Sequence, residues 1–185
     1  IEHAVLRSFH KKGMNSRQIL VAVSGGLDSM VLITLLQRLS RSLKLKLIVA
    51  HIHHGGASEY REKAFTFVRD YCNENNLAFV SNVSLKGEFP ELELSSEADL
   101  REYRYTELSR LLEQSKSFCL ATAHHRDDLL ETRVLRLIRG VGPQGLPAMY
   151  FFKDSKLRPL LDFSRVELEQ YAEQHSVNFV QDPTN

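Results

Sequence analysis

Strand-like and helix-like segments alternate along this chain. Ile19–Val23 is a short apolar run rich in β-branched residues, as expected for a strand buried on both faces. Apolar residues then recur every three or four positions from about Ser29 to Ser40, which predicts a helix. The alternation continues and predicts strands at Leu45–Ile52, Leu77–Val83 and Phe118–Ala123, and helices at about Ser58–Asn75, Ser95–Gln114 (N-cap Ser95 or Ser96) and Asp127–Arg139.

The pattern changes after the last of these helices. Gly140–Pro147 contains three glycines and two prolines, a density at which no regular element is expected. Beyond it we expect a short extended piece at Leu157–Leu161, a helix from about Ser164 to His175 and a final strand at Asn178–Val180. Strands that alternate with helices form a parallel sheet covered on both faces, so we predict a doubly wound α/β fold. Such folds bind ligands beyond the carboxyl ends of their strands.

Composition narrows the class of protein. The 185 residues are 43% hydrophobic and 25% charged, a mixture typical of a soluble globular domain. The apolar runs are far shorter than a membrane span, and Ile1–Ala4 lacks the basic start of a secretory signal, so we expect a cytoplasmic protein without a membrane partner. A net charge of +1 neither requires nor excludes nucleic acid. Cys72 and Cys119 are expected to be buried free thiols rather than metal ligands.

A candidate phosphate-binding loop follows the first strand. The segment Ser24-Gly25-Gly26-Leu27-Asp28-Ser29 joins that strand to a helix, and its glycines let backbone N–H groups approach a ligand at the positive end of the helix dipole. The loop has no Lys and is not a Walker A sequence. Asp28 would repel a phosphate unless a cation lay between them, so we infer Mg²⁺ bridging Asp28 and phosphate oxygens. The alternative without a ligand is a Ser/Gly turn in which Asp28 or Ser29 is a simple N-cap.

Polar residues also follow the fourth strand. His124 and His125 are followed by Asp127 and Asp128, and the histidines could contact phosphates, transfer protons or serve only as hydrogen-bonded structural residues. The acidic residues could favour the helix dipole. Our hypothesis is that one of the two binds Mg²⁺ or an ammonium group.

Arginines recur at intervals of three on two predicted helices. Such a stripe is either a solvated face or a surface for RNA phosphates, and the sequence leaves both interpretations open. The residues concerned are Arg101 and Arg104 on one helix and Arg133, Arg136 and Arg139 on the other.

The loop resembles the Ser-Gly-Gly-x-Asp-Ser motif of the N-type ATP pyrophosphatases, the PP-loop family. Further segments resemble one branch, the tRNA(Ile)-lysidine synthetases, in the order that these enzymes have them. They are Ala50–Gly55, Glu97–Tyr105, Ala123–Thr132, Arg136–Gly140, Gly145-Leu146, Arg158–Leu160 and Asp182-Pro183. His53, Gly56 and Leu129 depart from that pattern, which usually has Asn, Leu and Gln there, and Leu129 puts any contact made by the Gln in doubt.

The resemblance implies a Rossmann-like adenine nucleotide alpha hydrolase fold and ATP-dependent ligation of free L-lysine to C2 of the wobble cytidine (position 34) of tRNA(Ile) with a CAU anticodon. An adenylated tRNA is the intermediate, and AMP and pyrophosphate are released. The implied ATP contacts are Ala22, Ser24, Gly25, Gly26, Leu27, Asp28, Ser29 and His51. Asp28 would hold Mg²⁺, and the implied catalytic set is Asp28, His124, His125, Asp127 and Asp128.

The resemblance also implies a domain organisation. Residues 1–185 would be the ATP-binding catalytic domain, with about 140–185 as a linker-like and helical extension and without the C-terminal tRNA-binding domains that the family usually carries. A homodimer is among the expected assemblies. Two alternatives stay open: another tRNA-modifying PP-loop enzyme such as a thiolase, and a nucleotide-binding module without catalysis. Two cysteines in separate apolar stretches do not supply an iron–sulfur cluster, which disfavours the thiolase.

Overall fold

A computed structural model describes residues 1–55, 59–84, 96–140 and 149–181. Its helices are α1 (Glu2–Lys11), α2 (Leu27–Leu43), α3 (Glu59–Glu74), α4 (Glu97–Gln114), α5 (Arg126–Ile138) and α6 (Arg165–Gln174). Its strands are β1 (Gln18–Ala22), β2 (Lys46–His51), β3 (Ala78–Ser81), β4 (Cys119–Ala121), β5 (Phe152–Lys153) and β6 (Lys156–Leu157).

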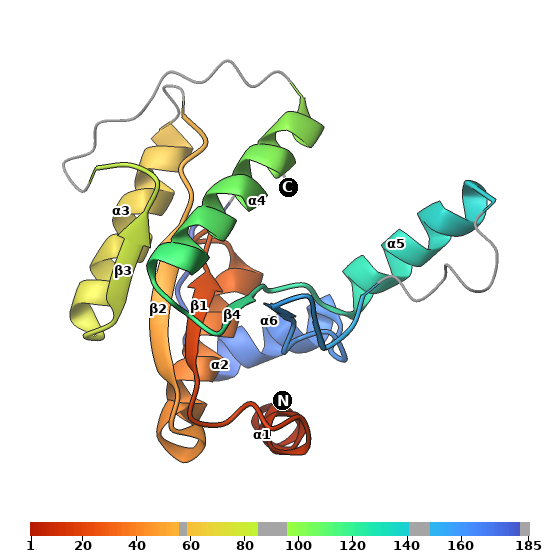
Figure 1. The fold of residues 1–185 in the computed structure, drawn as a ribbon, viewed down its shortest axis with the longest axis horizontal. Coiled ribbons are helices and arrows are strands. Elements are labelled where there is room, and N and C mark those ends of the chain that lie inside the picture. Colours follow the sequence, from red (N-terminus) through yellow and green to blue (C-terminus); the bar gives the residue numbers. More distant parts are fainter. Residues whose placement is uncertain (56–58, 85–95, 141–148, 182–185) are drawn as a thin grey trace.

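One sheet joins all of these strands in the order β3-β2-β1-β4-β6-β5 (Figure 1). Every neighbouring pair is parallel except β5 with β6, which is antiparallel. The predicted doubly wound α/β fold is therefore confirmed, with an antiparallel strand at one edge. The chain moves from β1 through β2 to β3 on one side and then returns to place β4 on the other side of β1. The loops after β1 and β4 consequently meet at the topological switch point, where such sheets bind ligands.

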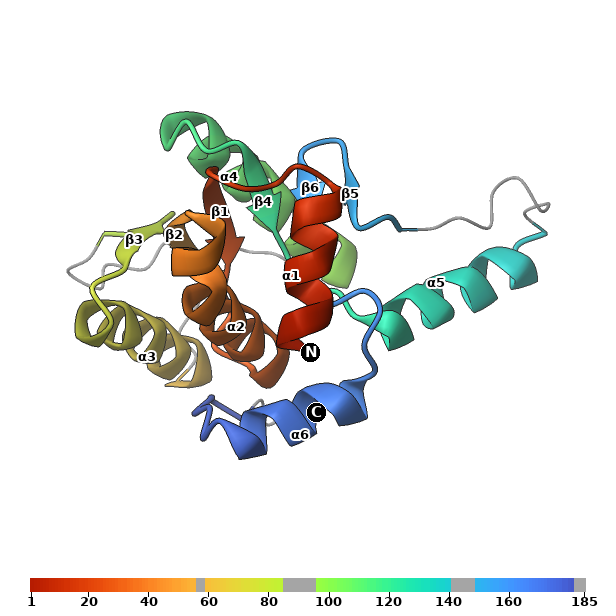
Figure 2. The same cartoon turned by 90° about the horizontal axis from the view of Figure 1, so that it is seen from below.

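Helices cover the two faces of the sheet unequally. In Figure 2, α1, α2, α3 and α6 lie on one side of the strands and α4 lies on the other. The alternating side chains of β1 show the reason: Ile19 and Val21 pack into the larger core with α2, whereas Leu20 packs into the smaller core with Leu108 and Leu111 of α4. The interior strand is thus buried on both faces, as its unbroken apolar sequence predicts.

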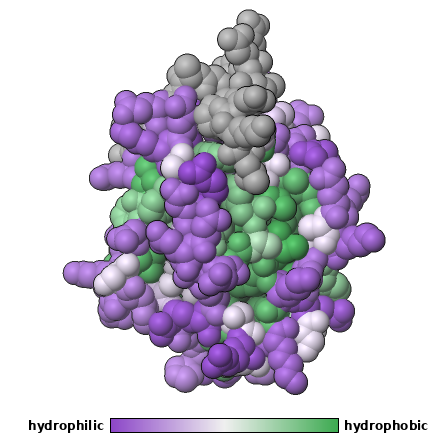
Figure 3. Space-filling view, turned by 90° about the vertical axis from the view of Figure 1, so that its left-hand side faces the viewer, coloured by the Kyte–Doolittle hydropathy of each residue, from purple (hydrophilic) through white to green (hydrophobic). Residues whose placement is uncertain are grey.

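The two ends of the sheet differ. β3 is an edge strand whose residues are not fully buried, and the face at that end carries apolar surface framed by hydrophilic side chains (Figure 3). At the other end, β5 and β6 form a short hairpin that adds residues 149–157 to the main sheet. The segment after residue 148 is therefore part of the same fold, and α6 packs against α2.

α5 stands apart from these layers. It projects away from the rest of the molecule in both ribbon views (Figures 1 and 2) and has no buried residue among its 13. Several large apolar side chains on it are at least 44% exposed: Leu130, Val134, Leu135, Leu137 and Ile138.

Three sequence predictions need comment. The final strand at Asn178–Val180 is wrong, because these residues join no ladder of the sheet, although the backbone N–H of Val180 donates to the carbonyl of Gly25 at 2.9 Å. Of the extended piece predicted at Leu157–Leu161 only Leu157 belongs to a strand, β6, because the chain turns directly after it. α1 and β5 were not predicted. The segments Gly145-Leu146 and Asp182-Pro183, with most of the Gly140–Pro147 stretch and Gly56, lie outside the described residues.

Candidate functional site

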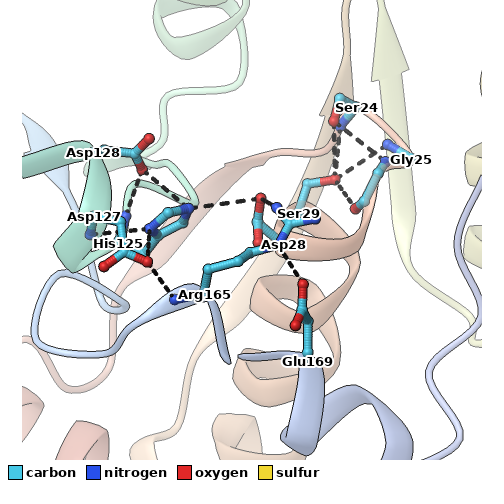
Figure 4. Close-up of polar contacts among 10 residues, drawn as sticks. Ser24, Gly25, Asp28, Ser29, His125, Asp127, Asp128, Arg165 and Glu169 are labelled. Atoms are coloured by element: carbon cyan, nitrogen blue, oxygen red, sulfur yellow. Dashed lines mark hydrogen bonds and ion pairs between the residues drawn. The ribbon is translucent and has the colours of Figure 1, made fainter. Parts of the chain in front are cut away.

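The phosphate-loop candidate is a turn held by one hydroxyl group. Ser29 lies in the first turn of α2, and its Oγ accepts hydrogen bonds from the backbone N–H groups of Ser24 (3.1 Å) and Gly25 (3.2 Å). The same hydroxyl donates to the carbonyl oxygen of Gly26 at 2.8 Å (Figure 4). These hydrogen bonds of Ser29 fix the conformation of the turn in the absence of a ligand.

Gly25 is at the point where this turn passes closest to a neighbouring helix. Its φ is +95°, and a Cβ added there would lie 3.4 Å from both Ala64 and Val68 of α3. An added Cβ would make only ordinary van der Waals contact with these residues, so it is the backbone conformation that disfavours an L side chain here.

The start of α2 is open to an anion. Its N-cap is Gly26, and no side chain caps the helix there. The first backbone N–H groups of a helix have no partner within it, and the positive end of the dipole lies beside them. Since Gly26, Leu27, Asp28 and Ser29 all line a cavity, these donors are available to a phosphate.

Asp28 lies at the centre of a charged network (Figure 4). Its Oδ2 accepts from Nη1 of Arg165 at 2.5 Å and lies 3.9 Å from Nε2 of His125. Its Oδ1 is buried and has no hydrogen-bond partner among the described residues. Burial raises the pKa of Asp28, while the nearby charges of Arg165 and His125 oppose that shift. The carboxylate thus has one oxygen paired with a guanidinium and one oxygen free for a further cation.

The donor set fits a magnesium ion that arrives with its nucleotide. In the described part of the chain, no group of three or more His, Cys, Asp or Glu side chains could hold a metal ion. Mg²⁺ commonly needs only one or two carboxylates, because phosphate oxygens and waters complete its shell. The unpaired Oδ1 of Asp28 meets that requirement.

His125 connects two helices to this network. It is the N-cap of α5. Its ring Nδ1 accepts a hydrogen bond from the backbone N–H of Asp127 at 3.3 Å, and its backbone N–H donates to Oδ2 of Asp128 at 2.8 Å. A neutral ring that accepts at Nδ1 carries its hydrogen on Nε2. That atom lies 3.6 Å from Asp128 and 3.9 Å from Asp28, so the ring stands between two carboxylates.

The two aspartates of α5 both have structural partners. Asp128 completes the capping box of its own helix. Asp127 accepts a hydrogen bond from the backbone N–H of Arg165 at 2.8 Å and so joins the start of α5 to the start of α6. Of the two, Asp128 lines the cavity and Asp127 does not.

Half-buried His124 and fully buried His51 occupy different positions. His124 lines the cavity and its Nδ1 lies 2.8 Å from the hydroxyl of Thr122, whereas His51 is absent from the cavity wall and its Nδ1 lies 2.9 Å from the carbonyl of Val23. Burial lowers the pKa of each ring to about 4. Both imidazoles are therefore neutral near pH 7, and His51 orients the strand end that leads into the phosphate loop.

The loops after β1, β2 and β4 share one cavity of about 900 Å³ with α4 and α6. It is large enough for a nucleotide and part of a second substrate. Of the predicted ATP contacts and catalytic residues, the wall includes Ala22, Ser24, Gly26, Leu27, Asp28, Ser29, His124 and Asp128. Gly25, His51, His125 and Asp127 lie behind this wall and support it.

The arginine stripes separate into two locations. Arg104 lines the cavity, and Arg101 lies near it on the same helix with its Cζ 5.1 Å from the Tyr105 ring centroid. Arg133, Arg136 and Arg139 lie on or directly after α5, outside the cavity.

The site includes functional candidates that sequence reasoning missed. Arg165 is 137 positions from Asp28 and has no motif around it that indicates a ligand contact. Its only signal is the N-terminal position on a helix with a Ser164–Glu167 capping box, which predicts a helix start and no more.

Comparison with known proteins shows which family this chain belongs to. The model of the PP-loop domain family matches residues 1–185. A tRNA(Ile)-lysidine synthase of Bdellovibrio bacteriovorus is 40% identical over 192 residues, and the match covers 100% of this chain and 57% of that protein. The tRNA(Ile)-lysidine synthase of Thermotoga maritima is 39% identical over 90% of this chain and 40% of its own length. The chain thus spans about half the length of these two relatives.

Solved structures show the same fold at low sequence identity. The U34-tRNA thiolase NcsA from Methanococcus maripaludis, which has a 4Fe-4S cluster, superposes with a TM-score of 0.77 at 19% identity and covers 100% of this chain and 65% of its own. The NH3-dependent NAD synthetase from Campylobacter jejuni has a TM-score of 0.59 at 16% identity, with 95% and 72% covered.

Proposed function

The chain belongs to the PP-loop family, and from that premise we propose that it is the catalytic domain of an enzyme that joins free L-lysine to C2 of the wobble cytidine in tRNA(Ile) with a CAU anticodon. The observation that carries the proposal is the uncapped start of α2 beside the unpaired carboxylate oxygen of Asp28, inside a cavity that also exposes His124. The sequence identity to lysidine synthases supports the choice of substrate. We place the reaction in the cytoplasm.

In the first step, the C2 carbonyl oxygen of cytidine attacks the α-phosphorus of ATP. The bond from that phosphorus to the bridging oxygen breaks, and pyrophosphate leaves while AMP stays on the cytidine oxygen. Negative charge builds on the phosphoryl oxygens, and the N–H groups at the start of α2 are placed to donate hydrogen bonds to these oxygens. Mg²⁺, held by Asp28 together with phosphate oxygens, would supply further charge neutralisation.

Arg165 has a place in this step. Its guanidinium neutralises Asp28 in the ligand-free protein, and the same group is within the cavity wall that a polyphosphate would occupy. If Oδ1 of Asp28 held Mg²⁺, the guanidinium of Arg165 on the same cavity wall would be able to pair with a phosphate oxygen, for which its planar fork is suited. Arg165 would thus pair with a negative charge both before and after the nucleotide binds.

In the second step, the lysine amine attacks C2 and AMP leaves with the former carbonyl oxygen. The amine must lose protons as the carbon–nitrogen bond forms. His124 is a neutral ring on the cavity wall and therefore has a free nitrogen lone pair for this purpose. Asp128, also on the wall, is the carboxylate that we assign to the lysine ammonium group.

The thiolase alternative lacks the ligands that its chemistry requires. Cys72 and Cys119 are the only cysteines of the chain; both are buried, and burial raises the pKa of each thiol to about 12. An iron–sulfur cluster needs three or four accessible thiolates. This is the observation that favours lysine as the nucleophile.

The test is a two-stage assay with tRNA(Ile) bearing a CAU anticodon. We expect ATP–pyrophosphate exchange that depends on tRNA, followed by AMP release and incorporation of radiolabelled lysine into the tRNA. A matched tRNA with cytidine 34 replaced by uridine should give neither signal. Exchange without lysine incorporation would point to another nucleophile, and nucleotide binding without exchange would leave only a binding module.

A further inference from the structure

Four cationic side chains gather around Tyr105, where α4 faces the β5–β6 hairpin. The Tyr105 ring centroid lies 5.1 Å from Cζ of Arg101, 5.8 Å from Cζ of Arg104 and 4.8 Å from Nζ of Lys156. Two of these cations come from α4 and one from β6, so the sheet and the helix converge on one aromatic ring. We call these residues, together with Arg158, the Tyr105 cluster.

Arg158 is a half-buried cation of the cluster. Its Nη1 donates to the carbonyl of Tyr150 at 3.1 Å, while its Nε is buried and has no hydrogen-bond partner in the described part of the chain. Burial lowers the pKa of Arg158 and Arg101 adds to that shift, whereas Tyr105 and the more distant carboxylate of Asp154 oppose it. A guanidinium that is partly desolvated, faces another cation and has an unused donor is costly to keep without an anion.

The cluster is electrostatically incomplete within the described residues. No carboxylate there lies within 4.0 Å of the charged nitrogens of its four cations. Neighbouring Arg110 on the same helix, in contrast, is paired with Glu107 at 2.7 Å. The negative face of the Tyr105 ring offsets part of the repulsion, since cations are attracted to an aromatic face within about 6 Å.

The cluster borders the reaction cavity. Arg104, Tyr105 and His124 all line the cavity wall, and the charges of Arg158, Arg101 and Arg104 each act on His124. The start of α2 already offers uncapped N–H groups to the phosphates of ATP on the same wall. The Tyr105 cluster is therefore available for a second anion that enters together with the cytidine.

We propose that the Tyr105 cluster binds the RNA phosphodiester groups on either side of the nucleotide that enters the cavity. The inference rests on the proposed function, because that function supplies an RNA substrate, and it adds Lys156, Arg158 and Tyr105 to its binding surface. A phosphodiester chain gives each cation an anionic oxygen and places the intervening base beside His124. The ring holds the cations together until the RNA arrives.

The test measures RNA and ATP binding separately. The RNA probe is a hairpin of the anticodon stem and loop with the CAU sequence. Its affinity for the protein is measured by fluorescence anisotropy at several salt concentrations, and the affinity for ATP is measured by equilibrium dialysis. We expect Lys156→Ala and Arg101→Ala each to weaken hairpin binding about fivefold or more and to lower the salt slope by about one unit, as loss of one phosphate contact does. Their ATP affinity should stay that of the wild type.

Two variants serve as matched controls. Arg110→Ala removes an arginine from the same helix that is already ion-paired, and should leave hairpin affinity within about twofold. Tyr105→Phe keeps the ring and should behave as wild type, whereas Tyr105→Leu removes the π face and should weaken hairpin binding.

The outcomes that overturn the inference are specific. If Lys156→Ala and Arg101→Ala bind the hairpin with unchanged affinity and salt slope, the cluster does not contact RNA. If they weaken ATP and hairpin binding equally, the cluster serves the nucleotide instead. Absence of lysine incorporation in an enzyme that binds the hairpin through these residues would contradict the proposed function and leave this inference standing.

Discussion

Two neighbouring residues determine the shape of the phosphate loop by different means. The hydroxyl of Ser29 joins three backbone groups, and Gly25 adopts a positive φ that an L side chain would disfavour. The loop is thus preorganised for an anion, so binding need not first order it.

Gly25→Ala should test the conformational requirement. A φ of +95° lies outside the left-handed region that an Ala can reach, so the substitution should lower the free energy of unfolding by about 3 kcal/mol. Gly13→Ala is the matched control, because its φ of +63° lies within that left-handed region. That variant should lose only about 1 kcal/mol. Urea unfolding measures both, and equal losses would show that the backbone conformation at Gly25 does not require a glycine.

Asp128→Asn should separate charge from capping. The amide oxygen can still accept from the N–H of His125, so α5 keeps its capping box while the cavity loses a charge. We expect the KM for lysine to rise about tenfold, on the order of one charge-assisted hydrogen bond. Asp127→Asn, outside the cavity wall, should leave lysine KM unchanged. Two unchanged values would remove the assignment of the ammonium group to this helix.

Local sequence was sufficient for part of the site and insufficient for the rest. The stretch from Ser24 to Ser29 is a continuous motif, so the turn and the start of the helix after it could be predicted from the sequence alone. Arg165 comes near Asp28 only because α6 packs beside α2, a contact between residues 137 positions apart. For His51 the motif position suggests a contact with the nucleotide, whereas its ring Nδ1 lies beside the backbone carbonyl of Val23.

At the level of elements, helix starts followed their capping signals closely. Ser96 caps α4 with Asp99, and Ser164 caps α6 with Glu167, each in a reciprocal capping box. Strand ends were less predictable, since a strand depends on its neighbours. Asn178–Val180 has strand-like residues, but Val180 pairs with the irregular loop at Gly25 rather than with a strand.

α5 should be the least protected helix of the described fold. It buries none of its residues, whereas α2 buries Leu32, Ile33, Leu35 and Leu36 completely. Local opening is easiest where few apolar contacts must be broken. Native-state hydrogen exchange should therefore show amides of α5 exchanging at least about a hundredfold faster than those of α2. Similar protection of the two helices in the isolated chain would indicate that α5 is packed in solution.

On the scale of the whole molecule, the order of strands brings the chemistry together. β1 and β4 are neighbours although 96 residues lie between Ala22 and Cys119, so the loops that follow these strands meet by topology and not by proximity in sequence. Alternating segments predicted the class of fold and the end of the sheet that carries the site. They could not predict the hairpin of β5 and β6, because two-residue strands leave no periodic pattern.

The stability of the fold should fall in mild acid. Burial lowers the pKa of His51 to about 4 in the folded protein, whereas an unfolded chain has an ordinary histidine pKa near 6.5. The unfolded state therefore binds more protons between these values, and stability is lost as the pH falls from about 6.5 towards 4. His51→Asn keeps a donor for Val23 without a titrating ring, so its melting temperature should fall less between pH 7 and pH 5. His3→Asn, at an exposed position, should follow the wild type.

α5 also has a mechanical consequence. Its base is bound to His125 and Asp128 at the cavity, while its other end projects into solvent. A helix of 13 residues is roughly 20 Å long, and this one begins beside the cavity. Because His125 is the N-cap of this helix, we expect a tilt of α5 to move the imidazole that lies between Asp28 and Asp128.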